Sequence, residues 1–378
     1  MRVLITGGAG FIGSSLALRL VDAGHEVAVL DALLPQIHGP NPATDSPLLA
    51  RIEGRVELVH GSVTDRDAWT RALADQQVVV HLAAETGTGQ SMYEVHRYAD
   101  TNVGGTSLML EVLAAGGHRV EKVVVASTRA LYGEGRYVAA DGSVHHPSAR
   151  LEADMAAGRF GLYHPDTGEE LRMTATDESS VIHPASVYGI TKQAQEQLVM
   201  AVCPTLGIAP TALRYQNVFG PGQSLTNPYT GILSIFSTRA LNGQPILVFE
   251  DGEESRDFVS IDDVVDATLK AITDDRANGE VFGIGSGVAT SVLTAARTLV
   301  AALEVDVPIE VTGAFRLGDI RHNVADLTKA ERLLGYRPKV DFQTGVRRFV
   351  EWVRTQPVQR DDYQRSIDEL RSRGLMRG

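Results

Sequence analysis

The sequence has few of the residues that cross-link a chain or anchor it in a membrane. Its one cysteine, Cys203, excludes an internal disulfide and a cysteine-rich zinc site, and we expect it to be a small buried hydrophobe on a helix. No apolar run approaches the roughly 18 to 20 residues that span a bilayer, and "MRVLITGG" enters a strand pattern without a signal-peptide layout. We therefore expect a cytoplasmic protein.

Positive charge is also scarce. The formal net charge of -12 argues against nucleic acid or an anionic membrane as a partner. A few well-placed arginines can still bind a phosphate group, so a phosphate ligand should be met by isolated arginines. His145 and His146 have no thiol or ordered set of carboxylates beside them, and we expect no metal site.

The first part of the chain alternates short apolar runs with helical stretches. Such alternation is typical of βαβ units, so we predict the α/β class with a doubly wound parallel Rossmann sheet. The predicted strands cover residues 2–6, 26–31, 55–61, 78–84, 122–127 and 209–215.

The rhythm changes twice along the chain. From about residue 216 glycine and proline loops, short strands and helices predict a smaller α/β domain over 216–378, after a Rossmann domain over 1–215. Residues 134–180 are polar and glycine-rich, and we predict an inserted flap with a short helix and a hairpin around "HPDTGEE". The last stretch, 361–378, predicts a terminal amphipathic helix.

The stretch "TGGAGFIG" joins the first predicted strand to the first helix. Its glycines fit G-x-G-x-x-G from Gly8 and G-x-x-G-x-x-G from Gly7, with Gly10 and Gly13 common to both. Either spacing lets the backbone approach a pyrophosphate at a helix N-terminus. Asp31 closes the second strand about 20 residues later, where a carboxylate accepts both ribose hydroxyls and repels a 2'-phosphate. The pattern predicts NAD rather than NADP.

A second pattern lies in "SVYGITK". Tyr188 and Lys192 are four residues apart, and a helix over 186–203 would place both on one face. The ammonium would then favour the phenolate and lower the pKa of Tyr188 toward that of a general base. Thr128 ends the apolar run "KVVVAS" and offers a further hydroxyl.

These motifs together resemble the extended short-chain dehydrogenase/reductase family, in its NAD-dependent nucleotide-sugar epimerase and dehydratase branch. The resemblance covers nearly the whole chain, through "GGAGFIG", "HLAA", "TNVGGT", "YGITK", "RYQNVFGPG", "RDFVSIDDV" and "LGYRP". It implies Tyr188 as catalytic base, Lys192 as its partner and Thr128 as the hydroxyl that shares the substrate proton. Ser62 departs from the family, where an aspartate usually contacts adenine.

The resemblance also implies the binding residues. The expected cofactor-binding residues are Gly7, Gly10, Phe11, Ile12, Gly13, Asp31, Ser62, Val63, Leu82, Ala83, Ala84, Asn102, Tyr188 and Lys192. The expected substrate-binding residues are Thr128, Asn217, Phe249, Arg256 and Arg316, of which the two arginines would neutralise a pyrophosphate and Phe249 would contact the base. Phe249 is equally well read as a core residue.

The residues after Thr128 bear on the reaction. Family members that eliminate water or decarboxylate carry acidic groups there, whereas this chain has Arg129 and Ala130. The resemblance thus favours 4-epimerisation of a nucleotide-diphosphate hexose through a transient 4-keto sugar. Segments such as "GTGQSMYEVHRYADTN" and "GDIRHNVAD" are most similar to dTDP-L-rhamnose 4-epimerase-type enzymes, which act on dTDP-6-deoxyhexoses.

Two alternatives stay open from the sequence. An NAD(P)H-dependent 4-ketoreductase of a nucleotide 4-keto-6-deoxyhexose would use the same tyrosine and lysine. A dinucleotide-binding sensor would keep the fold without the chemistry. In either case the helices at 98–116 and 186–203 carry apolar residues beyond one face, as in the family's dimer interface, and we predict a homodimer.

Overall fold

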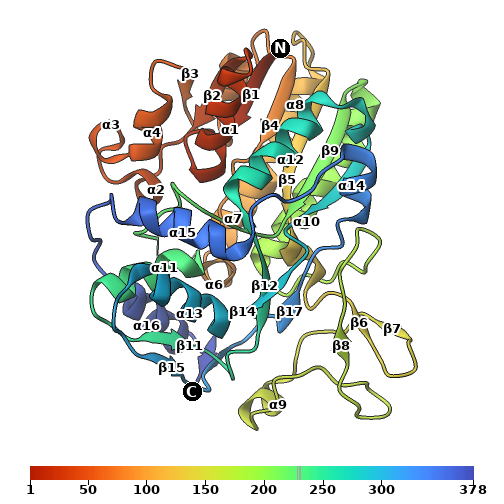
Figure 1. Ribbon diagram of the computed structural model, residues 1–378. Coiled ribbons are helices and arrows are strands. Elements are labelled where there is room, and N and C mark those ends of the chain that lie inside the picture. Colours follow the sequence, from red (N-terminus) through yellow and green to blue (C-terminus); the bar gives the residue numbers. More distant parts are fainter. Residues whose placement is uncertain (228, 230) are drawn as a thin grey trace.

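A seven-stranded sheet forms the centre of the larger half of the molecule (Figure 1). The structure is a computed structural model and describes residues 1–227, 229 and 231–378. Every neighbouring pair of strands is parallel, in the order β3-β2-β1-β4-β5-β9-β13. The predicted doubly wound parallel sheet is confirmed. Its strands are β1 (Arg2–Thr6), β2 (Glu26–Asp31), β3 (Glu57–His60), β4 (Val78–His81), β5 (Lys122–Thr128), β9 (Ala209–Tyr215) and β13 (Glu280–Ile284).

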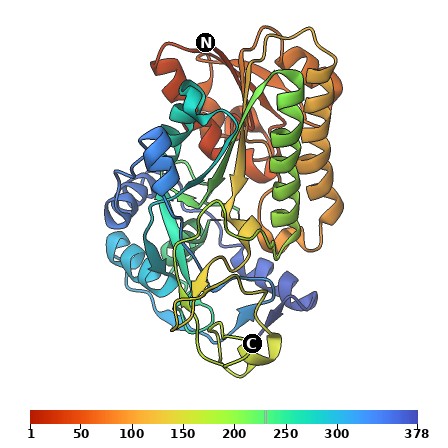
Figure 2. The ribbon, with the colours of Figure 1, turned by 90° about the vertical axis from the view of Figure 1, so that its right-hand side faces the viewer.

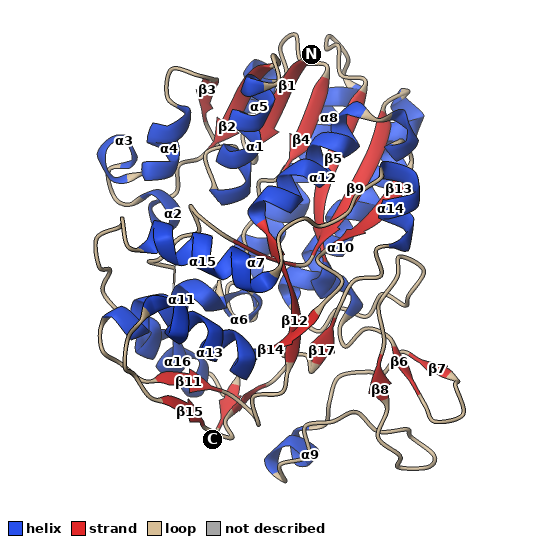
Figure 3. Ribbon diagram, in the orientation of Figure 1, coloured by secondary structure: helices blue, strands red, loops and turns tan. Residues whose placement is uncertain are grey.

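Helices cover both faces of this sheet (Figure 3). In β1, Val3 and Ile5 face one layer and Leu4 faces the other, because successive side chains of a strand point to opposite sides. A strand buried on both faces therefore reads as a continuous apolar run. The first layer contains α1 (Phe11–Asp22), α12 (Ile261–Thr273) and α14 (Thr328–Leu334), and the second contains α5 (Arg66–Ala72), α8 (Gly105–Ala114) and α10 (Val187–Val202).

The last strand of the sheet comes from far along the chain. β13 pairs with β9 in parallel, with Glu280 opposite Thr211 and Ile284 opposite Tyr215. α12 packs against α1 on the same sheet. Residues beyond 215 thus contribute to the Rossmann sheet, and the division into 1–215 and 216–378 stays a prediction.

The second half of the molecule has its own core, in which three helices pack on short strands. A four-stranded sheet joins β10 (Asn217–Phe219), β12 (Ser255–Ser260), β14 (Ala289–Ser291) and β17 (His322–Asn323). Two small sheets pair β11 (Ile246–Val248) with β15 (Ile309–Val311) and β16 (Phe315–Arg316) with β18 (Met376–Arg377). The helices are α11 (Ile232–Leu241), α13 (Val292–Leu303), α15 (Phe342–Val353) and the expected terminal α16 (Tyr363–Ser372).

Residues 134–180, where we predict an inserted flap, project beside the second half at the lower right of Figure 1. A small antiparallel sheet is its frame, and an isolated bridge from Tyr163 to Glu170 spans the expected hairpin. Its elements are β6 (Tyr137–Val138), β7 (Val144–His145), α9 (Glu152–Ala156) and β8 (Arg172–Met173).

Two long helices lie side by side along one edge of the molecule (Figure 2). One is α10; the other runs from α7 (Val95–Tyr98) through a π-helical turn (Ala99–Gly104) into α8. Shorter helices, α2 (Pro35–His38), α3 (Pro42–Asp45) and α4 (Pro47–Ile52), follow β2, and α6 (Thr88–Ser91) precedes α7. Over the described residues, no helix combines the length and apolar character needed to cross a membrane.

Candidate active site

A cavity of about 430 Å³ opens at the carboxyl ends of the sheet strands. It begins where the strand order reverses between β1 and β4, which is where ligands of open parallel sheets bind. Fourteen of the residues expected from the sequence line it: Gly7, Gly10, Phe11, Ile12, Gly13, Asp31, Ser62, Val63, Leu82, Ala83, Ala84, Thr128, Tyr188 and Lys192.

The glycine turn leaves no room for side chains. A Cβ on Gly13 would lie 2.3 Å from the Gly7 oxygen and 2.5 Å from the Gly8 Cα, and Gly7 has a φ of +65°. The Asp31 carboxylate accepts hydrogen bonds from the backbone N–H groups of Ala9 (3.0 Å) and Leu33 (2.9 Å). These bonds fix the carboxylate beside the turn, so a cradle for a pyrophosphate and an acceptor for ribose hydroxyls lie in one cavity. The residues present fit NAD.

The start of α10 brings the predicted base to the end of β5. Ser186 caps the helix by accepting the Gly189 N–H (3.1 Å), and the Tyr188 N–H donates to the Ser91 hydroxyl (3.0 Å). Gly189 allows the approach, because a Cβ there would lie 2.7 Å from the Ala130 oxygen. Tyr188 thereby meets the hydroxyl of Thr128. The two predicted groups for proton transfer are together.

The electrostatic surroundings of Tyr188 differ from the expectation. Burial raises the pKa of Tyr188, and the influences that oppose this rise are the hydrogen bond with Thr128 and the charge of Arg129. Lys192 is not among them, so the expected lowering of the phenol pKa by its ammonium is not found in this arrangement. Burial lowers the pKa of Lys192 itself to about 7, against the opposing charge of Glu196.

The ammonium of Lys192 is held by a side chain that the motif does not contain. It donates to the Gln195 amide oxygen, and the Gln195 amide nitrogen donates to the Thr106 hydroxyl (2.8 Å). Thr106 in turn donates to the Asn102 carbonyl (2.6 Å). These residues are nearly inaccessible, so the direction of each hydrogen bond is determined by its neighbours.

The same chain of hydrogen bonds continues to the wall of the cavity. Because the Thr106 hydroxyl donates its proton to the Asn102 carbonyl, it must accept from the Nε2 of His81 (3.0 Å). His81 Nδ1 then accepts from the Thr6 hydroxyl (2.7 Å), which itself accepts the Ala83 N–H (3.1 Å). Burial, with the charge of Lys192, lowers the pKa of His81 to about 3. A neutral Nε2–H imidazole is the form that satisfies every partner.

Five expected residues do not line the cavity. Asn102 is buried beneath it and binds the backbone of Glu85 and the Thr191 hydroxyl (3.0 Å), so it holds the loop after β4 against α10. Asn217 accepts from Arg129 Nε (3.0 Å). The other three are Phe249, Arg256 and Arg316.

The two arginines expected at the diphosphate differ in their freedom. Arg256 is 6% exposed, and its terminal nitrogens donate to the Asp319 carboxylate and to the carbonyls of Ser255, Ile320 and Arg321. Arg316 binds the Asp319 carboxylate (2.9 Å), and its Nε has no partner among the described residues. Arg316 is thus the arginine with donors still available.

Phe249 lies beside this free arginine. The Arg316 guanidinium sits 5.2 Å from the centre of its ring, a cation–π arrangement. The ring also packs on the small core under α16. Phe249 therefore supports Arg316, and its contact with a base stays a prediction.

Several lining residues escaped the sequence analysis. His38 and Leu34 follow β2 at the Asp31 end, where no motif marks them. Gln216 lies after β9; its amide nitrogen donates to Asn323 (2.9 Å), and its oxygen has no partner within the described part of the chain. It stands directly before Asn217 in "RYQNVFGPG", so its neighbour in the motif was the only available signal.

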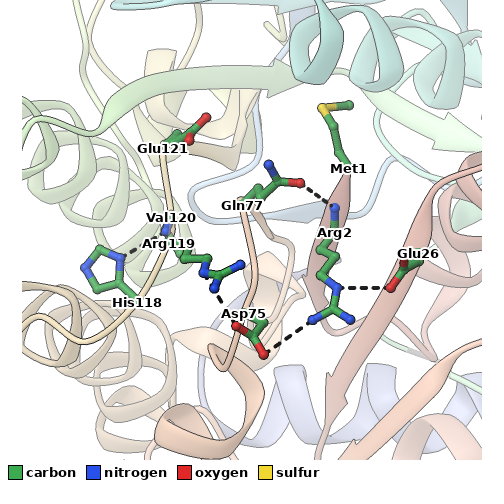
Figure 4. A pocket seen from close by; sticks show the side chains of 9 residues that line it. All are labelled: Met1, Arg2, Glu26, Asp75, Gln77, His118, Arg119, Val120 and Glu121. Carbon is green, nitrogen blue, oxygen red and sulfur yellow. Dashed lines mark hydrogen bonds and ion pairs between the residues drawn. The ribbon is translucent and has the colours of Figure 1, made fainter.

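A second depression, of about 580 Å³, lies at the opposite ends of the strands (Figure 4). Arg2 pairs there with Glu26 (3.0 Å) and Asp75 (3.4 Å), and Arg119 pairs with Asp75 (3.6 Å). These charges are already matched, and the amino ends of parallel strands are not where such sheets bind ligands. The depression gives no support for a second ligand site.

The model of the NAD-dependent epimerase/dehydratase family matches residues 3–152 and 157–285. The chain belongs to this family. A dTDP-L-rhamnose 4-epimerase from Burkholderia thailandensis is 40% identical over 354 residues, which cover 93% of this chain and 94% of that protein. A UDP-glucose 4-epimerase from Mycolicibacterium smegmatis is 31% identical, over 94% and 99% of the two chains.

Solved structures agree with this assignment. The UDP-glucose 4-epimerase of Thermotoga maritima, crystallised with UDP-glucose, superposes with a TM-score of 0.74 at 31% identity, over 94% of this chain and 99% of that one. The UDP-glucuronic acid 4-epimerase of Bacillus cereus, in complex with UDP-glucuronic acid and NAD, gives 0.75 at 26% identity, with the same shares covered. The family membership and the cavity together make this protein an NAD-dependent enzyme.

Proposed function

We propose that the protein is an NAD-dependent 4-epimerase of a nucleotide-diphosphate hexose, with a dTDP-6-deoxyhexose as its substrate. The observation that carries the proposal is the meeting of Thr128 and Tyr188 at the end of the cavity that holds the glycine turn and Asp31. The 40% identity to a dTDP-L-rhamnose 4-epimerase supports the sugar and the base.

The side chains divide the proton chemistry between them. NAD, when bound, accepts a hydride from the sugar carbon and returns it. Tyr188 takes the proton of the 4-hydroxyl as its phenolate, and Thr128 shares that proton through its hydrogen bond. Lys192 orients the cofactor ribose, and the positive charge that acts on the Tyr188 phenol comes from Arg129.

The acidic groups around the cavity support epimerisation rather than elimination. Asp31 and Glu85 are the carboxylic acids among the described lining residues. Asp31 is bound to the glycine turn, and Glu85 forms an ion pair with Arg97 (2.6 Å). Neither lies at the strand end that carries Thr128, where the next residues are Arg129 and Ala130, and this supports epimerisation over elimination.

The proposal is tested by product analysis. The protein is incubated with dTDP-L-rhamnose and with uridine, cytidine and guanosine diphosphate sugars, and proton NMR reads the configuration at C4. We expect interconversion of the dTDP-6-deoxyhexose without net change in NADH absorbance. Stoichiometric consumption of NAD(P)H with a 4-keto sugar would contradict the proposal and identify a ketoreductase.

A substitution of the proposed base separates chemistry from binding. Tyr188→Phe should reduce kcat by about three orders of magnitude, because it removes the proton-transfer group, and should leave NAD bound. Tyr163→Phe is the matched control, since Tyr163 is exposed in the insertion. Full activity of Tyr188→Phe would refute the assigned role.

We also propose a homodimer built on α10 and the α7–α8 helix. Val95 and Ile190 support it, because each is about half exposed on these two helices. Sedimentation equilibrium at micromolar concentration should give twice the chain mass, and a monomer would remove the proposal.

A further inference from the structure

The insertion is joined to the second half by an arginine whose donors are all in use. Arg150 donates from Nε to Glu134 (3.1 Å), in a bidentate pair to Glu250 (2.7 and 2.8 Å), and to the carbonyls of Phe160 (3.3 Å) and Asp319 (3.0 Å). Its side chain is 2% exposed. Five N–H groups with five acceptors leave the guanidinium one orientation.

The insertion binds the backbone at 319–321 through a second side chain. Glu134 accepts the Arg321 N–H (2.7 Å), two residues after the carbonyl that Arg150 binds. From the other side, Arg256 on β12 donates to the carbonyls of Ile320 and Arg321. The backbone at 319–321 is therefore clamped between the insertion and β12.

This clamped segment carries the carboxylate that orients Arg316. Asp319 accepts from Arg256 through one oxygen and from Arg316 through the other, both at 2.9 Å. Burial raises the pKa of Asp319, yet the surrounding arginines hold it well below its usual range. The charged carboxylate fixes one end of Arg316 and leaves its Nε without a partner among the described residues.

We propose that the 134–180 insertion is a working part of the nucleotide-sugar site, in which Arg150 is the positioning residue that fixes the 319–321 segment and thereby aims Arg316 at the diphosphate. The inference rests on the proposed function, and it gives the insertion a role that the family motifs do not assign.

The charge balance of this cluster agrees with an anionic ligand. Burial raises the pKa of Glu254 to about 8, so this carboxyl is mostly neutral at neutral pH, whereas Glu134, whose pKa burial raises to about 7, accepts from Arg150 and from the Arg321 N–H. The arginines keep their charge, and positive charge is left in excess. The side chains that face one another here are Arg129, Arg150, Arg256, Arg316, Arg321, Glu134, Glu250, Asp251, Glu254, Asp319 and His322.

The test compares nucleotide binding with cofactor retention. Binding of dTDP, and in parallel of UDP, is measured by calorimetry on the purified full-length protein, and its NAD content is measured after denaturation. Arg150→Met should weaken binding of the preferred nucleotide about tenfold and raise KM more than it lowers kcat, because a displaced Arg316 loses its alignment. The NAD content should stay that of the wild type.

Two further variants make the result decisive. Arg172→Met changes an exposed arginine of the same insertion and should bind nucleotide like the wild type. If Arg150→Met fails to fold, Arg150→Lys decides, because it keeps the buried charge and loses the fork of donors; we expect about threefold weaker binding with a retained cooperative melt. Wild-type affinity in whichever of the two folds would overturn the inference and leave the epimerase proposal standing. A wild type that binds neither nucleotide would contradict the proposed function itself.

Discussion

The active region has two parts that recognise ligands by different means: a cofactor half around the glycine turn and an arginine half around Asp319. The cavity at the glycine turn is shaped by backbone and apolar side chains, with Asp31 as its fixed acceptor. The region around Asp319 is built from buried arginines and carboxyls. The first half depends on close approach and the second on charge, so steric changes should damage one and charge changes the other.

The largest effect is expected in the cofactor half. Gly13→Ala would place a Cβ 2.3 Å from the Gly7 oxygen, a backbone atom that cannot rotate away. We expect loss of bound NAD and destabilisation by more than about 3 kcal/mol, measured by cofactor absorbance and urea unfolding. Gly104→Ala is the control, because the nearest atom to its added Cβ would be a carboxylate oxygen of Asp100, 3.4 Å away. A Gly13→Ala variant that still retains NAD would contradict the claim that the cofactor half depends on close approach.

In the arginine half, binding should suffer while the fold persists. Arg316→Met removes a half-buried guanidinium that has an unpartnered Nε, and we expect about 10- to 100-fold weaker nucleotide-sugar binding with unchanged NAD content. Calorimetry with dTDP measures the effect. Arg297→Met, at an exposed position of α13, should behave like the wild type. Equal loss in both variants would show that general positive charge, not placement, governs binding.

In the arginine half, Glu254 should make the free energy of unfolding depend on pH. Burial raises the folded pKa of Glu254 from its ordinary value of 4.5 to about 8, so its contribution to stability is present below pH 4.5 and is lost as pH rises through 8. Glu254→Gln stays neutral, and its stability relative to the wild type should grow between pH 5 and pH 8 by up to about 4 kcal/mol.

Urea unfolding at both pH values measures this difference. Glu253→Gln, an exposed neighbour, should show no such growth. A constant difference between Glu254→Gln and the wild type would mean that the buried carboxyl is ionised at both pH values.

The smallest effect is expected at Lys192, in the wall of the cofactor cavity. Gln195→Met removes the amide that holds Lys192 and leaves Thr106 without one donor. We expect kcat to fall about fivefold, with NAD retained, because a net hydrogen bond is worth about 1 kcal/mol. Gln193→Met, two positions earlier on the same helix, should keep wild-type kcat, and equal loss there would contradict the role of Gln195.

The sequence predicted the cofactor half better than the arginine half, for a physical reason. Gly13 and Asp31 act within neighbouring strand–turn–helix units, so their spacing in the chain encodes their spacing in space. Arg150, in contrast, binds Glu250 and Asp319, far along the chain, and no local pattern encodes such a meeting. The insertion was visible as a change in composition, but its attachment was not.

Electrostatic detail was the other limit. The spacing of Tyr188 and Lys192 indicated a shared helix face, and α10 supplies it. Burial, however, raises the pKa of Tyr188, opposite to the expected direction, and lowers that of Lys192. The Lys192 ammonium donates its hydrogen bond to Gln195. Burial is a property of the whole packing, so the sequence pattern could not give it.

The sheet can be completed only late in synthesis, because β13 is made long after its partner β9. While the ribosome is still making residues 216 to 279, β9 is an apolar strand with an open edge, because its partner does not yet exist. Such edges pair with other chains, and the nascent protein must keep this one covered until Ile284 has emerged. A chain truncated before Glu280 should therefore aggregate on refolding, even though its glycine turn, Tyr188 and Lys192 are all complete.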